Sequence, residues 1–108
     1  MSVNKVILLG NVGADPEMHY PDKNTVIANF SVATSEHVGE NRTEVTEWHR
    51  VVMYGESAKF AERYIRKGTK IYIEGKLKYR EYTDRFKINR KISEIIVLNF
   101  EILGRKPS

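Results

Sequence analysis

VIANFSVAT, residues 26–34, gives the clearest structural signal in the chain, because apolar and polar side chains alternate along it. Ala28, Phe30 and Val32 fall on one face of an extended chain, and polar side chains lie between them. This alternation is typical of an antiparallel strand with one face in a core and the other in solvent. The fold is therefore expected to contain a half-buried antiparallel sheet.

Further strands are expected on both sides of this one. They are Asn4–Gly10, Val45–Tyr54, Thr69–Tyr79 and Ser93–Leu103. Gly75 interrupts the fourth strand in chain order and predicts a bulge or a tight bend there.

Only Glu56–Lys67 has a helical pattern, with Ala58, Ala61, Tyr64 and Ile65 on one face and Gly68 as the residue just past the end. Five strands with one helix between the third and the fourth is the order of an OB-fold barrel.

A chain of 108 residues is the size of one domain. We expect the OB-fold to occupy residues 1–104 and residues 105–108 to form a short C-terminal remnant. The chain has no cysteine, which excludes disulfides and thiolate metal sites and makes a reducing cytoplasm the simplest compartment. The first apolar run, Val6 to Leu9, is too short for a signal peptide or a membrane span, so no membrane partner is expected.

The charge is distributed unevenly along the chain. Residues 1–65 hold six bases and nine acids, whereas residues 66–108 hold twelve bases and five acids. Between Arg66 and Lys91 four aromatic side chains lie among ten bases. Cations neutralise phosphates and aromatic faces accept unpaired bases, so this segment predicts binding of single-stranded nucleic acid. The alternative is a solvated strand pair whose charges only prevent aggregation.

Two expected strands are apolar on both faces, although a small barrel has one interior. Val6 to Leu9 and Ile95 to Leu98 would each expose a hydrophobic row in a monomer. Self-association would bury these rows, and a covering helix or loop is the alternative.

Three segments carry a family resemblance. They are Asn4–Gly13 (NKVILLGNVG) with Asp15-Pro16-Glu17 and Tyr20; Thr46–Gly55 (TEWHRVVMYG); and Tyr64–Gly68 (YIRKG) with Ile71–Leu77 (IYIEGKL). In this order and spacing they resemble the bacterial single-stranded DNA-binding proteins over essentially the whole chain. The resemblance implies an OB-fold protein, a homotetramer, that coats and protects single-stranded DNA in replication, recombination and repair, in the cytoplasm at the nucleoid. A primosomal OB-fold dimer acting in replication restart is the alternative within this group.

The resemblance also implies site residues. Trp48, Tyr54 and Tyr82 take the positions of base-stacking aromatic residues, with Trp48 as a core anchor being the alternative. Together with the neighbouring cations and aromatics, the candidate site comprises Trp48, Arg50, Tyr54, Tyr72, Lys76, Lys78, Tyr79, Arg80, Tyr82, Arg85, Phe86 and Lys87.

The sequence departs from the family pattern at two places. Val38 stands where a further stacking tryptophan is usual, so weaker binding or a shorter occluded length is expected unless His37 replaces that contact. The long tail with an acidic tip is missing after Ser108, which places recruitment of replication and repair proteins in doubt.

No catalytic pattern or cofactor motif is present, so the chain is not expected to be an enzyme and no cofactor is expected. His19, His37 and His49 lack metal-ligand spacing. A nuclease-like carboxylate set of Asp15, Glu17 and Asp22 is the alternative, but the neighbouring prolines indicate turns, so no metal is expected.

Overall fold

The structure, a computed structural model, describes residues 1–105 and the side chains of residues 1–104. The proposed boundary at residue 104 therefore falls at the edge of the described part, and residues 106–108 of the expected remnant lie outside it. The elements are β1 (Val6–Val12), β2 (Glu17–Asp22), β3 (Thr25–Val38), β4 (Thr43–Tyr54), α1 (Glu56–Tyr64), β5 (Thr69–Thr83) and β6 (Asn89–Arg105).

The strands form one sheet that closes into a barrel. Their order is β1-β5-β6-β4-β3-β2, and β1 also pairs with β3 where Asn11 lies opposite Ala33. The pairing of β4 with β6 is parallel, and the other pairings are antiparallel. The five strands expected from the sequence and the position of the helix are present, so the OB-fold prediction is confirmed.

The core lies inside this ring of strands. The alternating residues of the 26–34 stretch point inward, and Ala28 and Val32 are fully buried. Val51 and Met53 of β4 and Ile71 and Ile73 of β5 meet them there. The helix closes one end of the barrel with Ala58 and Ala61, and Ile65, the residue after the helix, belongs to the same core. Each buried Val or Ile side chain stabilises the fold by about 1.5–3 kcal/mol, which fixes the register of every strand that carries one.

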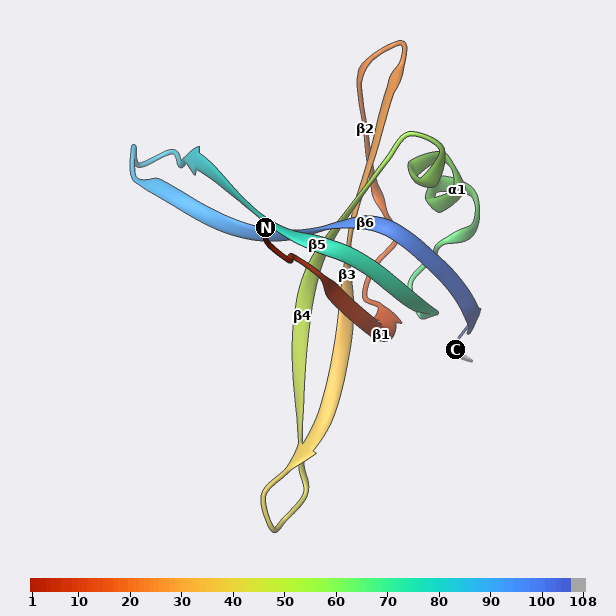
Figure 1. The fold of residues 1–108 in the computed structure, drawn as a ribbon, viewed down its shortest axis with the longest axis vertical. Helices are drawn as coiled ribbons and strands as arrows, with labels where there is room; N and C mark the ends of the chain where they lie inside the picture. Colours follow the sequence, from red (N-terminus) through yellow and green to blue (C-terminus); the bar gives the residue numbers. More distant parts are fainter. Residues whose placement is uncertain (106–108) are drawn as a thin grey trace.

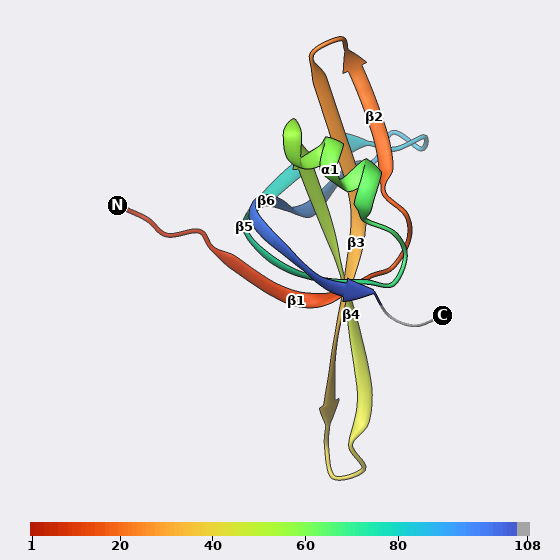
Figure 2. The ribbon, with the colours of Figure 1, turned by 90° about the vertical axis from the view of Figure 1, so that its right-hand side faces the viewer.

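Three hairpins project from the barrel: β2–β3, β3–β4 and β5–β6 (Figure 1). The view turned by 90° shows α1 beside the β2–β3 hairpin (Figure 2). The radius of gyration of 15.4 Å exceeds the value of about 13 Å expected for a compact domain of this length. The projecting hairpins account for this expansion, and they place many side chains outside the core.

Strand β2 was not expected from the sequence. Five of its six residues are exposed, so the strand has no apolar alternation to reveal it. It is an edge strand that pairs with β3 on one side only. Pro21 is tolerated there because an edge strand leaves some amide positions unpaired. The Pro21-Asp22 turn is confirmed: the backbone amide of Asn24 donates to the Asp22 carboxylate at 2.8 Å.

The helix is shorter than expected and ends at Tyr64 instead of Lys67. Ile65 adopts an extended backbone conformation and buries its side chain in the core, which turns the chain out of the helix. Gly68 is therefore not the residue just past the helix. It occupies a turn with φ of 90°, and its amide donates to the carbonyl of Val12 at 2.8 Å. Tyr64 was also expected on the buried face, but its side chain is exposed.

The interruption of β5 by Gly75 is a bulge, as expected. The pairing with β6 shifts between Glu74 and Gly75, which leaves Leu98 without a partner in the register. A Cβ on Gly75 would lie 2.3 Å from the carbonyl oxygen of Ile96, so the two backbones approach more closely than any other residue would allow.

The outward apolar rows are present in part. Ile7 and Leu9 on β1 and Leu98 on β6 are exposed, as expected for a single copy of the chain. Ile96, in the same apolar run as Leu98, is buried beside Val52 of the adjacent strand β4. No helix in the described part of the chain is long and apolar enough to cross a membrane.

Candidate nucleic-acid interface

Strand β4 places three candidate residues on one face. Val51 and Met53 point into the core, so the alternate residues Trp48, Arg50 and Tyr54 point outward. Trp48 has 62% of its surface exposed, which excludes the alternative that it anchors the core.

Trp48 borders three separate hollows of the surface. The first is shared with Asp15, Asn29 and Arg50, and the second with Arg50, Leu77, Lys91 and Ser93. The third hollow is lined by Ser35, Thr46 and Lys67, among others. A flat ring beside hollows that contain cations has the geometry needed to stack on a base while the adjoining phosphates meet positive charge.

Tyr54, Arg80 and Tyr82 form a second group on the outward face of β4 and β5, where both phenol groups lie near the guanidinium. Arg80 is held in place by Glu94 of β6: its Nε lies 3.1 Å from Oε1. The hydrogen bond to this carboxylate is the main reason that the pKa of Arg80 is raised. Because Glu94 balances the charge, Arg80 is less available to a phosphate than an unpaired cation.

Lys76 and Lys78 lie on the same face of β5 as Arg80, and neither has an ion-pair partner within residues 1–104. Tyr79 points to the opposite face of the β5–β6 hairpin. There the Nζ of Lys91 lies 5.3 Å from the centre of the Tyr79 ring, within cation–π range. The hairpin therefore carries an aromatic and a cation on each of its two faces.

Asp84 organises the tip of the β5–β6 hairpin. Its Oδ1 accepts hydrogen bonds from the amides of Phe86 at 2.8 Å and Ile88 at 3.0 Å, and its Oδ2 lies 3.0 Å from Nε of Arg90. The pKa of Asp84 is lowered, first by the amide of Ile88 and then by Arg90. Lys87 completes the turn with φ of 61°.

This tip presents two further candidate residues. Phe86 is 68% exposed, and the guanidinium carbon of Arg85 lies 5.0 Å from the centre of the Phe86 ring. The hydrogen-bonded turn keeps the Phe86 ring exposed to solvent, with a cation beside it. A base can stack on such a ring.

Tyr72 shares a face of β5 with Lys76 and Lys78 but lies nearer the start of the strand, beside β1. It lies opposite Leu9 in the register of β1 and β5, on the same outward face as Ile7 and Leu9. Its hydroxyl donates to Glu74 at 2.7 Å, and this hydrogen bond is the main cause of the raised pKa of Tyr72. Tyr72 therefore belongs to the apolar outward surface of β1.

Sequence reasoning missed three residues that shape this surface: Lys91, Asp84 and Glu94. Ser93 lies opposite Tyr79, and Lys91, two residues away on the same strand, therefore shares the face of Tyr79. This can be inferred only once the register of β5 and β6 is known. The roles of Asp84 and Glu94 depend on contacts across the hairpin, which the local sequence around each residue does not reveal.

The carboxylates considered as metal ligands serve other purposes. Asp15 accepts the backbone amide of Lys67 at 2.8 Å, and Asp22 stabilises a turn. No group of three or more potential ligands gathers within the described residues. His49 is half-buried and lies 2.7 Å from the hydroxyl of Thr34, which agrees with a structural role.

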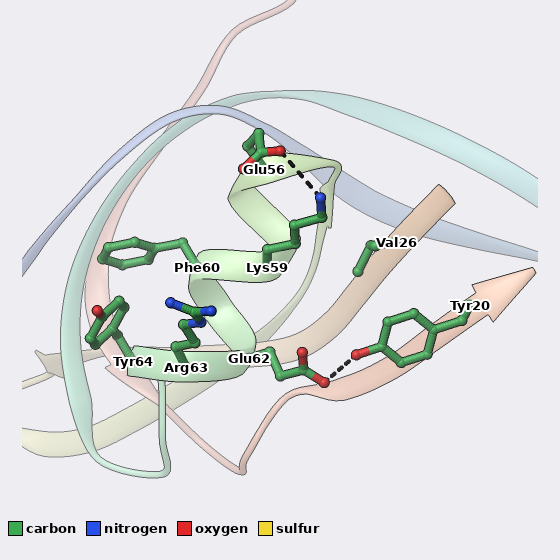
Figure 3. A pocket seen from close by; sticks show the side chains of 8 residues that line it. All are labelled: Tyr20, Val26, Glu56, Lys59, Phe60, Glu62, Arg63 and Tyr64. Carbon is green, nitrogen blue, oxygen red and sulfur yellow. Dashed lines mark hydrogen bonds and ion pairs between the residues drawn. The ribbon is translucent and has the colours of Figure 1, made fainter. Parts of the chain in front are cut away.

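A hollow of about 640 Å³ lies between α1 and the β2–β3 hairpin (Figure 3). Two of its polar contacts are internal: the hydroxyl of Tyr20 donates to Glu62, and Lys59 pairs with Glu56 at 3.3 Å. Phe60 and Tyr64 contribute aromatic rings from the same helix. The residues that line this hollow are separate from those of the aromatic and cationic surface.

The fold and the surface define an OB-fold nucleic-acid-binding module. Comparison with protein families agrees, because the model of the single-strand binding protein family matches residues 3–103. The chain belongs to this family.

Two similar proteins show how far the likeness extends. A protein of Bacteroides thetaiotaomicron named single-stranded DNA-binding protein is 43% identical over 111 residues, which cover 98% of this chain and 69% of the relative. A solved structure described as a Plasmodium falciparum SSB complex with ssDNA superposes with a TM-score of 0.84 at 29% identity, covering 98% of this chain and 97% of that one.

Proposed function

We propose that this protein binds single-stranded DNA without regard to sequence, and that it coats and protects unwound DNA during replication, recombination and repair. The observation that carries the proposal is the outward face of the barrel, where Trp48, Tyr54 and Tyr82 are exposed beside cations. Family membership and the similar DNA complex support it. A location in the cytoplasm at the nucleoid follows from this role.

Binding combines two kinds of contact. Bases stack on Trp48 and on the Tyr54–Tyr82 group, and every base offers a face for stacking, which explains the tolerance of sequence. Phosphates meet the unpaired cations of the β5–β6 hairpin, chiefly Lys76 and Lys78 and the cations at the tip. Phe86 extends the stacking surface to the end of the hairpin.

The β3–β4 hairpin supplies less to this surface than in relatives with a further tryptophan. Val38 ends β3 as an exposed aliphatic side chain, and an aliphatic side chain cannot stack on a base. We therefore expect the DNA to follow the β5–β6 hairpin, and the occluded length to be shorter.

The chain acts by binding and not by catalysis. The family is defined by single-strand binding, and the similar Bacteroides protein is named for DNA binding. The same comparisons favour this function over the primosomal alternative.

We also propose that the protein is a homotetramer. From Val6 to Gly10, β1 pairs with β5 on one edge only, because its pairing with β3 begins at Asn11. Exposed Ile7 and Leu9 accompany this unpaired edge, and an apolar edge strand readily pairs with another chain.

Fluorescence of Trp48, the single tryptophan of the chain, tests the binding proposal. Addition of oligo-dT is expected to quench it to saturation, because the ring stacks on a base, whereas blunt duplex DNA at equal phosphate concentration should leave most of it unchanged. Binding that is equal for both DNAs, or magnesium-dependent loss of a labelled oligonucleotide, would contradict the proposal.

A further inference from the structure

Gly13 lies against the benzene edge of the Trp48 ring. It follows the last residue of β1, and its amide donates to the carbonyl of Ser31 at 2.9 Å, which holds it against β3. A Cβ atom on Gly13 would lie 2.4 Å from Cζ3 and 3.2 Å from Cε3 of Trp48, and 2.7 Å from the hydroxyl oxygen of Ser31. Carbon atoms in contact are normally about 3.5–4.0 Å apart. The indole therefore occupies space that exists because residue 13 has no side chain.

Backbone conformation does not require a glycine here. The glycines with positive φ among the described residues are Gly39, Gly55, Gly68 and Gly104, and Gly13 is not one of them. An alanine can therefore adopt the backbone conformation of residue 13 without strain. The steric conflict with Trp48 is the larger constraint at this position.

The conflict at Gly13 differs in kind from those at the other tightly packed glycines. A Cβ on Gly10 would lie 2.1 Å from the carbonyl oxygen of Ala33, and a Cβ on Gly75 would meet the backbone of Ile96. Those two glycines let strands approach one another. At Gly13 the nearest atom belongs to an exposed side chain that the proposed function uses.

We propose that Gly13 is a positioning residue for DNA binding, which sets the orientation of the Trp48 ring by leaving room for its edge against the end of β1. This inference rests on the proposed function and deepens it. Contact with the backbone on one side restricts the ring before DNA arrives, so less side-chain entropy is lost on stacking. A displaced ring would also obstruct the hollows that adjoin Trp48 on either side.

Gly13→Ala tests the positioning in the free protein. Because Trp48 is the single tryptophan, its emission reports the ring directly. We expect a red-shifted emission maximum and stronger quenching by acrylamide, since the added methyl group pushes the ring into solvent. Unchanged emission and quenching would overturn the inference.

DNA binding gives the second measurement. Gly13→Ala should weaken oligo-dT binding about three- to tenfold, which is part of the loss expected for a whole base–aromatic stack, without changing the salt dependence. Gly39→Ala is the matched control. Its φ of 76° makes an alanine strained, but no atom lies within 4 Å of the added methyl group. The control should lower the melting temperature while leaving emission and binding unchanged.

A double-mutant cycle separates positioning from a general effect on the fold. On a Trp48→Ala background, Gly13→Ala should change oligo-dT binding less than twofold, because the ring it displaces is gone. An equal loss on both backgrounds would overturn the inference. If Gly13→Ala alone fails to fold, Gly13→Ala with Trp48→Ala should restore folding, and a double variant that also fails would show that Gly13 is purely structural.

Failure of the inference can be told apart from failure of the proposed function. If the wild-type protein does not bind oligo-dT, the proposed function is wrong, but the emission of free Gly13→Ala still decides whether Gly13 positions the ring.

Discussion

Leu9→Glu is expected to dissociate the proposed assembly. Leu9 lies on the outward row of β1 beside an edge that has no partner in this chain, so a subunit contact there would enclose its side chain. A glutamate in the same position would carry a charge into that contact. The barrel core should be unaffected, because Leu8, and not Leu9, points inward.

The size of the effect follows from the exposure of the row. Ile7, Leu9 and Leu98 are 55%, 53% and 68% exposed, and burial of these fractions is worth about 3–5 kcal/mol per subunit. Replacing Leu9 by glutamate removes roughly 1 kcal/mol of this burial free energy, and burying the carboxylate adds a desolvation cost of several kcal/mol. Each substitution occurs twice in a twofold interface, so the free-energy cost doubles. The association constant of the subunit contact should therefore fall by at least about four powers of ten.

Light scattering coupled to size-exclusion chromatography measures the outcome directly. At micromolar concentration in physiological salt, the wild-type protein should have the mass of a tetramer and Leu9→Glu a smaller mass. Val38→Glu is the matched control, because it places the same charge at an exposed apolar residue of the β3–β4 hairpin and should leave the mass unchanged. A wild-type monomer, or Leu9→Glu with the wild-type mass, would refute the assignment of this row to a subunit contact.

Three further predictions concern the binding surface. Trp48→Ala should weaken oligo-dT binding by about 1–3 kcal/mol, the range typical of base–aromatic stacking in OB-folds of this class, and titration should show the same salt dependence as wild type. Lys78→Ala should lower the slope of log K against log salt by about 0.7, whereas Arg80→Ala should lower it less and reduce the melting temperature, because it leaves Glu94 buried without its partner. The folded-state pKa of Asp84 lies below its ordinary value, so its hydrogen bonds stabilise the hairpin tip at neutral pH. This stabilisation is lost as the pH falls from about 3.9 through the folded pKa, and amide exchange at the tip should rise in that range. Asp84→Asn should remove the pH dependence.

The strands with a regular pattern could be predicted from the sequence. Ala28, Phe30 and Val32 alternate with polar residues, and the structure buries all three. The bulge at Gly75 was also predictable, because glycine in a strand signals a close backbone approach. In both cases local pattern and burial agree.

Elements that depend on distant contacts could not be predicted. Strand β2 has no apolar face, so its pairing with β3 leaves no trace in its own residues. The helix α1 ends early because Ile65 buries its side chain in the core, and the residues that surround it there lie in other elements. Tertiary packing decides both outcomes.

The candidate surface shows the same division. Exposure of Trp48 and Tyr82 could be inferred from their charged neighbours and from the family resemblance. The separation of Tyr72 from Tyr82 is a separation along β5, because only the first half of the strand pairs with β1. The partial neutralisation of Arg80 by Glu94 spans two strands and could not be read from local sequence.

The most direct test of the central claim is the salt dependence of oligo-dT binding, followed through Trp48 fluorescence at several salt concentrations. Neutralisation of roughly five phosphates per subunit by the cations of the second half of the chain predicts a slope of log K against log salt near −3.5, at about −0.7 per phosphate on single strands. A slope near −3.5 with saturable quenching of Trp48 would agree with stacking joined to phosphate neutralisation. A slope near zero would contradict the account.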